Sequence, residues 1–355
     1  MAASSPAADT ASTPAVVAAQ DARIAIMGRV AGTESGGVRM GFPGSVIRFA
    51  YRGPAPVMRF SASSDDCWFN LAVNGWDPAP MRLTRGESTA IVPAGVAPES
   101  GYAVELTRRT ESWQGVATFL GLELPAGCEL LPPPPWPERR LLFIGDSMTC
   151  GQYIERLPPE NDATARTSNA GRSFGMLLGR RLGAQVHLVS YGGRGVMRDW
   201  EGRSDTGTAP QIFERSLPDD PASSWDHAAY QPDVVVICLG QNDLSTGLPD
   251  EGAFLKAYAD LVARVREVHP QAGIVLAESA MHGEDSGSED AARRVFLRAI
   301  LESIIVRRRA AGDTRIVFAP LHKQPGTVHD SHPVAFQHEK IAEELTAPIR
   351  KLTGW

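Results

Sequence analysis

Four short polar segments of this chain hold the side chains that acyl transfer requires. The reaction needs a nucleophile, a base that takes its proton, a group that orients the base, and donors for the oxyanion. Ser147, in the segment GDSMTCG, could be the nucleophile, and His332, in DSHP, could be the base. Asp330 could bind the other ring nitrogen of His332 and fix its tautomer. These residue types predict a serine esterase.

Donors for the oxyanion are also present. They are the backbone N–H of Ser147, the backbone N–H of Gly193 in GGRG, and the side-chain amide of Asn242 in GQND. A glycine lets the backbone approach the substrate closely, and an amide donates without titrating. Loss of one such donor typically costs roughly 3–4 kcal/mol of transition-state stabilisation. Gly195 is the alternative donor if the glycine-rich segment is displaced by two residues.

Each segment also has a purely structural interpretation. A serine directly after a strand, such as Ser147, is most often a helix N-cap. The glycines around Gly193 could only make a turn, Asn242 and Asp243 could form an Asx-turn, and His332 could be a solvated loop residue. The four segments together, in this order and each after an apolar run, favour catalysis.

Apolar runs alternate with amphipathic stretches through the second part of the chain. This alternation predicts a parallel sheet covered by helices on both faces. Because the carboxyl ends of parallel strands meet at one edge, the four polar segments should converge there. The predicted strands are residues 140–147, 185–193, 233–243, 272–280 and 314–322, and the predicted helices are residues 173–183, 252–269, 289–312 and 334–352.

The first part of the chain has a different texture. Residues 23–131 contain short alternating runs separated by Gly, Pro, Asn and Asp, which predicts an all-β sandwich of jelly-roll type. Residues 132–138 include four consecutive prolines and predict a stiff linker to an α/β domain at residues 139–355. Residues 1–22 are rich in Ala, Ser, Thr and Pro, lack the features of a signal peptide, and predict a disordered leader.

Composition excludes several classes of function. The formal net charge of −6 leaves no basic surface for a phosphate backbone, so we expect no nucleic-acid partner. No apolar run reaches the length of about 18 residues that a bilayer requires, so we expect no membrane span. The histidines near the C-terminus lack a recognised ligand spacing, and we expect neither a metal nor an organic cofactor.

The segments GDSMTCG, GGRG, GQND and DSHP resemble the four sequence blocks of the SGNH (GDSL-type) hydrolases, a flavodoxin-like esterase superfamily. With its β-sandwich, the whole chain is similar to carbohydrate esterase family 2, the acetyl xylan esterases. The resemblance implies removal of O-acetyl groups from xylan, glucomannan or derived oligosaccharides through an acetyl-enzyme. It assigns the roles given above to Ser147, His332, Gly193 and Asn242, and it implies a secreted or periplasmic enzyme.

One position departs from the superfamily pattern. The acid usually stands three residues before the histidine, where this chain has His329. Asp330 fits the shorter spacing of family 2, in which a backbone carbonyl can orient the histidine instead. We therefore expect Asp330→Ala to cost far less activity than Ser147→Ala or His332→Ala.

Residues that contact the substrate are harder to assign from the sequence. Trp200 and Trp225 could stack on a sugar ring and Arg194 could bind its hydroxyls, although packing and a solvated surface explain such residues equally well. Two other functions stay open. The chain could be an SGNH lipase or thioesterase acting on other short acyl esters, or a carbohydrate-binding protein with residual esterase activity.

Overall fold

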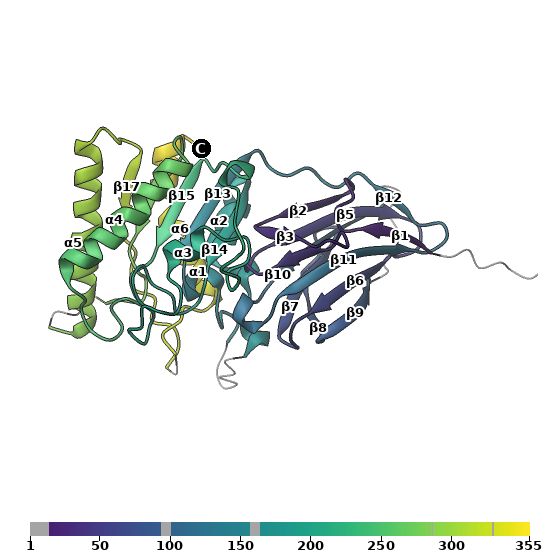
Figure 1. Ribbon diagram of the computed structural model, residues 1–355, viewed down its shortest axis with the longest axis horizontal. Coiled ribbons are helices and arrows are strands. Elements are labelled where there is room, and N and C mark those ends of the chain that lie inside the picture. Colours follow the sequence, from purple (N-terminus) through teal and green to yellow (C-terminus); the bar gives the residue numbers. More distant parts are fainter. Residues whose placement is uncertain (1–13, 94–100, 157–163, 284, 286, 329) are drawn as a thin grey trace, which may run out of the picture.

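The computed structural model describes residues 14–93, 101–156, 164–283, 285, 287–328 and 330–355. An antiparallel β unit and an α/β unit lie side by side (Figure 1). The expected fold, a β-sandwich followed by a parallel sheet flanked by helices, is confirmed. Within the described ranges, no helix is long and apolar enough to span a membrane.

Two antiparallel sheets make up the described part of the β unit. One has the order β3-β4-β11-β6-β9 with β1 on β11, and the other has the order β12-β5-β10-β7-β8 with β2 on β5. Aromatic residues such as Phe49, Phe60 and Phe119 fill the space between the sheets. The elements are β1 (Ala15–Ala18), β2 (Ile24–Met27), β3 (Val30–Gly32), β4 (Val38–Met40), β5 (Val46–Arg52), β6 (Val57–Ala62), β7 (Cys67–Val73), β8 (Ala79–Leu83), β9 (Gly86–Ile91), β10 (Tyr102–Arg108), η1 (Ser112–Gln114), β11 (Ala117–Leu124) and β12 (Glu129–Leu131).

Strand β1 corrects the expectation of a disordered leader through residue 22. Residues 15–18 pair antiparallel with β11, and Val17 is buried. Gly121 of β11 has φ of +119°, and a Cβ there would lie 2.0 Å from the Val17 carbonyl oxygen, so a glycine allows the strand to dock. The small residues around this segment predicted disorder, whereas in the fold residues 15–18 form an edge strand. Residues 1–13 of the expected leader lie outside the described residues.

The α/β unit is built on a parallel sheet with the strand order β14-β13-β15-β16-β17. This is the flavodoxin-like order 2-1-3-4-5. Helices α2 and α6 pack on one face, and α3, α4 and α5 pack on the other. The elements are β13 (Arg139–Gly145), α1 (Ser147–Cys150), η2 (Ala165–Thr167), η3 (Ala170–Arg172), α2 (Phe174–Leu182), β14 (Ala184–Ser190), α3 (Ala209–Phe213), η4 (His227–Ala229), β15 (Val234–Cys238), α4 (Glu251–Val268), β16 (Gly273–Ala277), α5 (Glu289–Ala310), β17 (Ile316–Ala319) and α6 (Ala335–Thr353).

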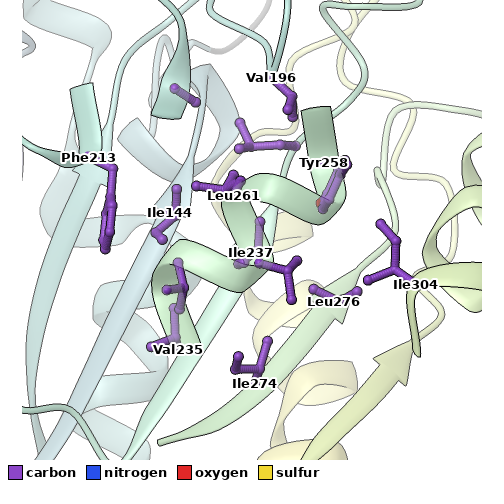
Figure 2. Packing of buried hydrophobic residues seen from close by; sticks show 14 of the residues in the cluster. Ile144, Val196, Phe213, Val235, Ile237, Tyr258, Leu261, Ile274, Leu276 and Ile304 are labelled. Atoms are coloured by element: carbon purple, nitrogen blue, oxygen red, sulfur yellow. The ribbon is translucent and has the colours of Figure 1, made fainter. Parts of the chain in front are cut away.

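Strands β13, β15 and β16 are buried on both sides, as expected for a central parallel sheet. Figure 2 shows the α4 and α5 side of this core, where Ile237 and Leu276 of the sheet face Leu261 of α4 and Ile304 of α5. Close packing on both faces fixes the strands, and therefore fixes the loops that leave their carboxyl ends.

Buried contacts join the two units. Arg29 of the β unit is 2% exposed, and its guanidinium donates to the backbone carbonyls of Phe213 and Arg215. The same guanidinium lies over the rings of Phe213 and Trp225, 5.1 and 5.2 Å from their centroids. The neighbouring Gly28 N–H donates to Nε2 of His187 at 3.1 Å. The units therefore share buried polar contacts and do not meet only through residues 132–138.

Candidate active site

A cavity of about 790 Å³ opens at the carboxyl ends of the parallel strands. Residues that follow all five of these strands line it, together with one residue of the β unit. The lining residues include Trp113, Ser147, Gln152, Gly192, Gly193, Arg194, Trp200, Asn242, Met281, His282, Arg293, Lys323, Gln324 and His332. The polar segments singled out in the sequence therefore do converge on one edge of the sheet.

Ser147 begins α1 directly after β13. The helix N-cap is Asp146, whose side chain accepts from the Met148 N–H at 3.2 Å, so the interpretation of Ser147 as the N-cap is wrong. A Cβ at Gly145 would lie 1.9 Å from Oγ1 of Thr149, so only glycine allows this tight turn. The turn leaves Ser147 Oγ at the cavity, 2.8 Å from Nε2 of His332.

His332 contacts a carboxylate on its other side. Its Nδ1 lies 2.6 Å from Oδ1 of Asp330, which also accepts the His332 backbone N–H at 2.7 Å. A hydrogen on Nδ1 leaves Nε2 as the acceptor that faces Ser147 Oγ. Burial alone would raise the pKa of Asp330, but hydrogen bonds from His332 and the charges of His332 and Arg156 hold this pKa well below its usual value. The ionised carboxylate is thus able to orient His332 and to stabilise its protonated form. His329, the superfamily's usual acid position, lies outside the described residues.

Asn242 lies beside Ser147 in a buried hydrogen-bond network. Its amide donates to Oδ2 of Asp146 at 3.3 Å and to the carbonyl of Arg194 at 3.0 Å. Gln241 donates to Oδ1 of Asp146 at 3.1 Å and accepts from Ser279 Oγ at 2.6 Å. Burial, together with the charges of Asp243 and Glu111, raises the pKa of Asp146 to about 8. The network fixes the Asn242 amide at the cavity wall.

Gly193 lines the cavity with a backbone that favours glycine. Its φ is +77°, and a Cβ there would lie 2.7 Å from Cδ1 of Trp200. Gly195, the alternative donor, is outside the cavity lining, and a Cβ there would lie 2.2 Å from Oδ2 of Asp243. Gly195 therefore makes room for a carboxylate beneath the loop, while Gly193 faces the site.

Asp243 explains why that loop keeps its shape. Its buried carboxylate accepts the backbone N–H groups of Val196, Met197 and Arg198 at 2.9, 2.8 and 3.1 Å. The loop after β14 is thus tied to the loop after β15. Gly193 and Asn242, the oxyanion donors expected from these two loops, are therefore held in fixed positions relative to each other.

The three proposed substrate contacts fall in two places. Trp200, which is 57% exposed, and Arg194 line the cavity. Trp225 does not reach it, because its ring packs 6.0 Å from the ring of His187 and under the guanidinium of Arg29 at the junction with the β unit. Both tryptophans lie in the sequence between β14 and β15, so their positions did not show which of them reaches the cavity. The segment that contains Trp225 instead packs against Arg29 of the β unit.

Sequence reasoning missed the cavity residues from outside the four segments. Trp113, in the loop after β10, is 47% exposed at the cavity, and Met281 and His282 follow β16. An aromatic residue between two predicted strands was the available signal for Trp113. Nothing in the sequence showed that this loop reaches the α/β unit.

The C-terminal histidines have separate environments. His338 is buried and accepts the Phe174 N–H at 3.1 Å through Nδ1, while His322 pairs with Glu344 at 3.0 Å. In the described ranges, no group of three or more His, Cys, Asp or Glu residues could hold a metal ion. All four cysteines of the sequence are described and carry free thiols.

Two family patterns match most of the chain. The Carbohydrate esterase 2 N-terminal family matches residues 26–134, and the GDSL-like Lipase/Acylhydrolase family matches residues 143–339. A relative from Cellvibrio japonicus named acetylxylan esterase / glucomannan deacetylase is 34% identical over 341 residues, which cover 96% of this chain and 91% of that protein.

Solved structures agree with these matches. A family two carbohydrate esterase from Cellvibrio japonicus superposes with a TM-score of 0.89 at 31% identity, covering 97% of this chain and 99% of that one. A family two carbohydrate esterase from Clostridium thermocellum in complex with cellohexaose gives a TM-score of 0.84 at 28% identity, covering 94% of this chain and 99% of that one. The likeness thus spans both units.

Proposed function

The chain belongs to family 2 of the carbohydrate esterases, and we propose that it removes O-acetyl groups from plant polysaccharides such as xylan or glucomannan, or from their oligosaccharides. It is a carboxylic ester hydrolase. The observation that carries the chemistry is the 2.8 Å contact between Ser147 Oγ and His332 Nε2 at an open cavity. The substrate class is supported by the relative named acetylxylan esterase / glucomannan deacetylase.

In the proposed mechanism, Ser147 Oγ attacks the acetyl carbonyl carbon while His332 Nε2 takes the hydroxyl proton. The tetrahedral intermediate collapses, the bond to the sugar oxygen breaks, and His332 returns the proton to that oxygen. Water then attacks the acetyl-enzyme with His332 as base and releases acetate. Asp330 holds the imidazole and faces the positive charge that it gains in each step.

The oxyanion would be bound by the backbone N–H groups of Ser147 and Gly193 and by the Asn242 amide. The position of Asn242 supports this assignment, because its contacts with Asp146 and with the Arg194 carbonyl hold the amide at the wall of the cavity that Ser147 also lines.

The lining of the cavity favours a sugar ester over a long acyl chain. Gln152, Arg194, Arg293 and Gln324 provide donors for hydroxyl groups. The exposed indoles of Trp113 and Trp200 are flat apolar surfaces suited to the faces of sugar rings. A polymer of this kind is too large to enter a cell, so we propose that the enzyme acts outside the cytoplasm.

Acetate release tests the proposal. Wild-type enzyme and Ser147→Ala are compared on acetylated xylan, acetylated glucomannan and acetylated monosaccharides, and the acetate is measured. We expect release from at least one polymer by the wild type and none above background by Ser147→Ala. A parallel series of p-nitrophenyl esters from acetate to octanoate should show a steep fall beyond acetate. Equal or higher rates on the longer esters, without release from any polymer, would instead identify a lipase or thioesterase.

A further inference from the structure

The loop after β10 carries a buried carboxylate from the β unit to the active site. Arg108, at the end of β10, is fully buried, and its guanidinium donates to the backbone carbonyls of Met40 and Thr110 at 2.8 Å each and of Glu111 at 3.0 Å. The Glu111 backbone N–H donates to Oε1 of Gln114 at 3.0 Å. The backbone of Glu111 is therefore held on both sides.

Arg109 fixes the same loop to the α/β unit. Its backbone carbonyl accepts the Ala170 N–H at 3.0 Å, and its guanidinium donates to the carbonyls of Ser168 and Arg166 at 3.2 and 2.7 Å. It also forms an ion pair with Glu155, between α1 and η2. The position of Glu111 relative to the active site is thus determined by buried contacts across the two units.

The side chain of Glu111 reaches the loop that carries Gly193. Glu111 is 1% exposed, and its Oε2 accepts the N–H of Gly192 at 2.5 Å. The carboxyl group also interacts with the thiol of Cys150, at the end of the helix that Ser147 begins, and with Trp113. The carboxyl group therefore binds the glycine turn and lies close to the helix of Ser147 and to the cavity wall.

The glycine at position 192 is matched to this carboxylate. A Cβ there would lie 2.9 Å from Oε2 of Glu111 and 2.7 Å from Oε1 of Gln152. A larger residue would force either the turn or the ends of these two side chains to move, and either change would disturb the contact. Because Gly192 has no side chain, the carboxylate can approach its backbone N–H as closely as the hydrogen bond requires.

We propose that Glu111 is a positioning residue of the reaction: it holds the Gly192–Gly193 turn so that the Gly193 N–H faces the oxyanion. The inference depends on the proposed function, since it concerns the same reaction. It also makes the β unit part of the catalytic apparatus, because the α/β unit by itself lacks the acceptor for Gly192. Burial raises the pKa of Glu111, and the surrounding donors and the nearby charge of His332 act in the opposite direction.

The main test compares Glu111→Met, which removes the acceptor but keeps the length of the side chain, with Glu111→Gln, whose amide oxygen can still accept the Gly192 N–H. Turnover of p-nitrophenyl acetate is measured per active site, counted by the burst of p-nitrophenol when diethyl p-nitrophenyl phosphate phosphorylates Ser147. We expect Glu111→Met to lose about 10- to 100-fold in kcat, somewhat less than loss of a whole oxyanion donor, with KM within about twofold. Glu111→Gln should recover at least about a third of the wild-type kcat.

A matched control comes from the same unit. Glu105 of β10 pairs with Arg48 at 2.7 Å and does not line the cavity, so Glu105→Met should keep the wild-type kcat. Gly192→Ala tests the contact from the other side and serves if Glu111→Met fails to fold. Its added methyl group should lower kcat with little change in KM.

The outcomes separate the inference from the proposed function. If Glu111→Met and Gly192→Ala keep the wild-type kcat per active site, the inference is overturned and the esterase proposal stands. If Glu111→Gln is as slow as Glu111→Met, a hydrogen bond to Gly192 is not what the reaction needs, and the inference is also overturned. If the wild type shows no turnover that depends on Ser147, the proposed function fails and the inference fails with it.

Discussion

Arg156 places a terminal guanidinium nitrogen 2.8 Å from Oδ2 of Asp330. The arginine side chain is only 3% exposed, so the pair is shielded from water on the arginine side. The other oxygen, Oδ1, faces Nδ1 of His332 at 2.6 Å. Asp330 thus has one oxygen toward each partner, and the charge of Arg156 favours the rotation of the carboxyl group that turns Oδ1 to the histidine.

Replacement of Asp330 by alanine should lower kcat without abolishing turnover. The imidazole loses its orienting acceptor and the partner of its positive charge, but Ser147, His332 and the oxyanion donors stay. In a serine protease triad, loss of the acid costs about 100-fold less than loss of the serine or histidine. We therefore expect Asp330→Ala to keep about 100 times the activity of Ser147→Ala, measured as kcat on p-nitrophenyl acetate. Equal loss in both variants would show that no other group orients His332.

Removal of Arg156 should slow the reaction through Asp330. Arg156→Met removes the charge that faces Oδ2, so the Asp330 carboxylate is held less firmly against His332, and we expect kcat to fall about 10-fold with KM nearly unchanged. Arg172→Met is the control, because Arg172 is 50% exposed and, among the described residues, forms an ion pair only with Glu155, at 3.6 Å. A rise in KM at constant kcat in Arg156→Met would assign Arg156 to substrate binding instead.

Trp113 should matter for sugars and not for small esters. Removal of an indole that packs on a sugar ring should cost roughly 1–1.5 kcal/mol, or about 5- to 12-fold in KM for acetylated xylo-oligosaccharides. Trp113→Ala should keep kcat on p-nitrophenyl acetate within about threefold, since the Gly192 contact of Glu111 is retained. Trp76→Ala is the matched control, because Trp76 is 53% exposed on the same unit but does not line the cavity. If both variants bind oligosaccharide as tightly as the wild type, Trp113 is not a substrate contact.

The parallel sheet was the more predictable part of the fold. Strands such as Val234–Cys238 are continuous apolar runs between amphipathic helices, a pattern typical of parallel sheets that are covered on both faces. The β-sandwich strands were visible as alternation, but β1 was not, because its four small apolar residues carry no turn signal. How the two units dock could not be predicted, since it depends on buried polar residues such as Arg29 and Arg109 whose partners are far away in the sequence.

The residues of the site also fall into a group that the sequence could predict and a group that it could not. Ser147, Gly193, Asn242 and His332 could be placed together because each follows a strand of one parallel sheet, and the topology brings strand ends to one edge. The same reasoning could not place Glu111, Trp113 and Arg156 at the site. Nothing in the neighbouring sequence indicates that a carboxylate, an indole or a guanidinium in a loop belongs to a distant cavity. Such residues are found only through contacts between segments, which an alternating pattern of apolar residues does not encode.

Buried histidines should make the fold less stable in weak acid. Burial, and then the charges of His227, Arg29 and Arg264, lowers the pKa of His269 to about 4. Its side chain is 1% exposed, and neither ring nitrogen has a hydrogen-bond partner among the described residues. An unfolded chain binds a proton at this histidine below a pH of about 6.5, whereas the folded chain does not until about 4. The unfolded state is therefore favoured progressively as the pH falls through this window, by up to about 3 kcal/mol for one such residue.

Substitution of His269 should reduce this dependence on pH. In His269→Phe, the ring stays in contact with the neighbouring Phe213 but can no longer bind a proton. We expect the unfolding free energy of this variant, from urea titrations, to fall less steeply than that of the wild type as the pH is lowered from 7.5 to 4.5. The unfolding free energies of the two proteins should be most alike at pH 7.5. His322→Gln is the control, because the His322 side chain is 80% exposed, and it should keep the wild-type slope. A wild-type slope in His269→Phe would mean that other groups, such as the buried His338, whose pKa burial lowers to about 3, cause the loss of stability.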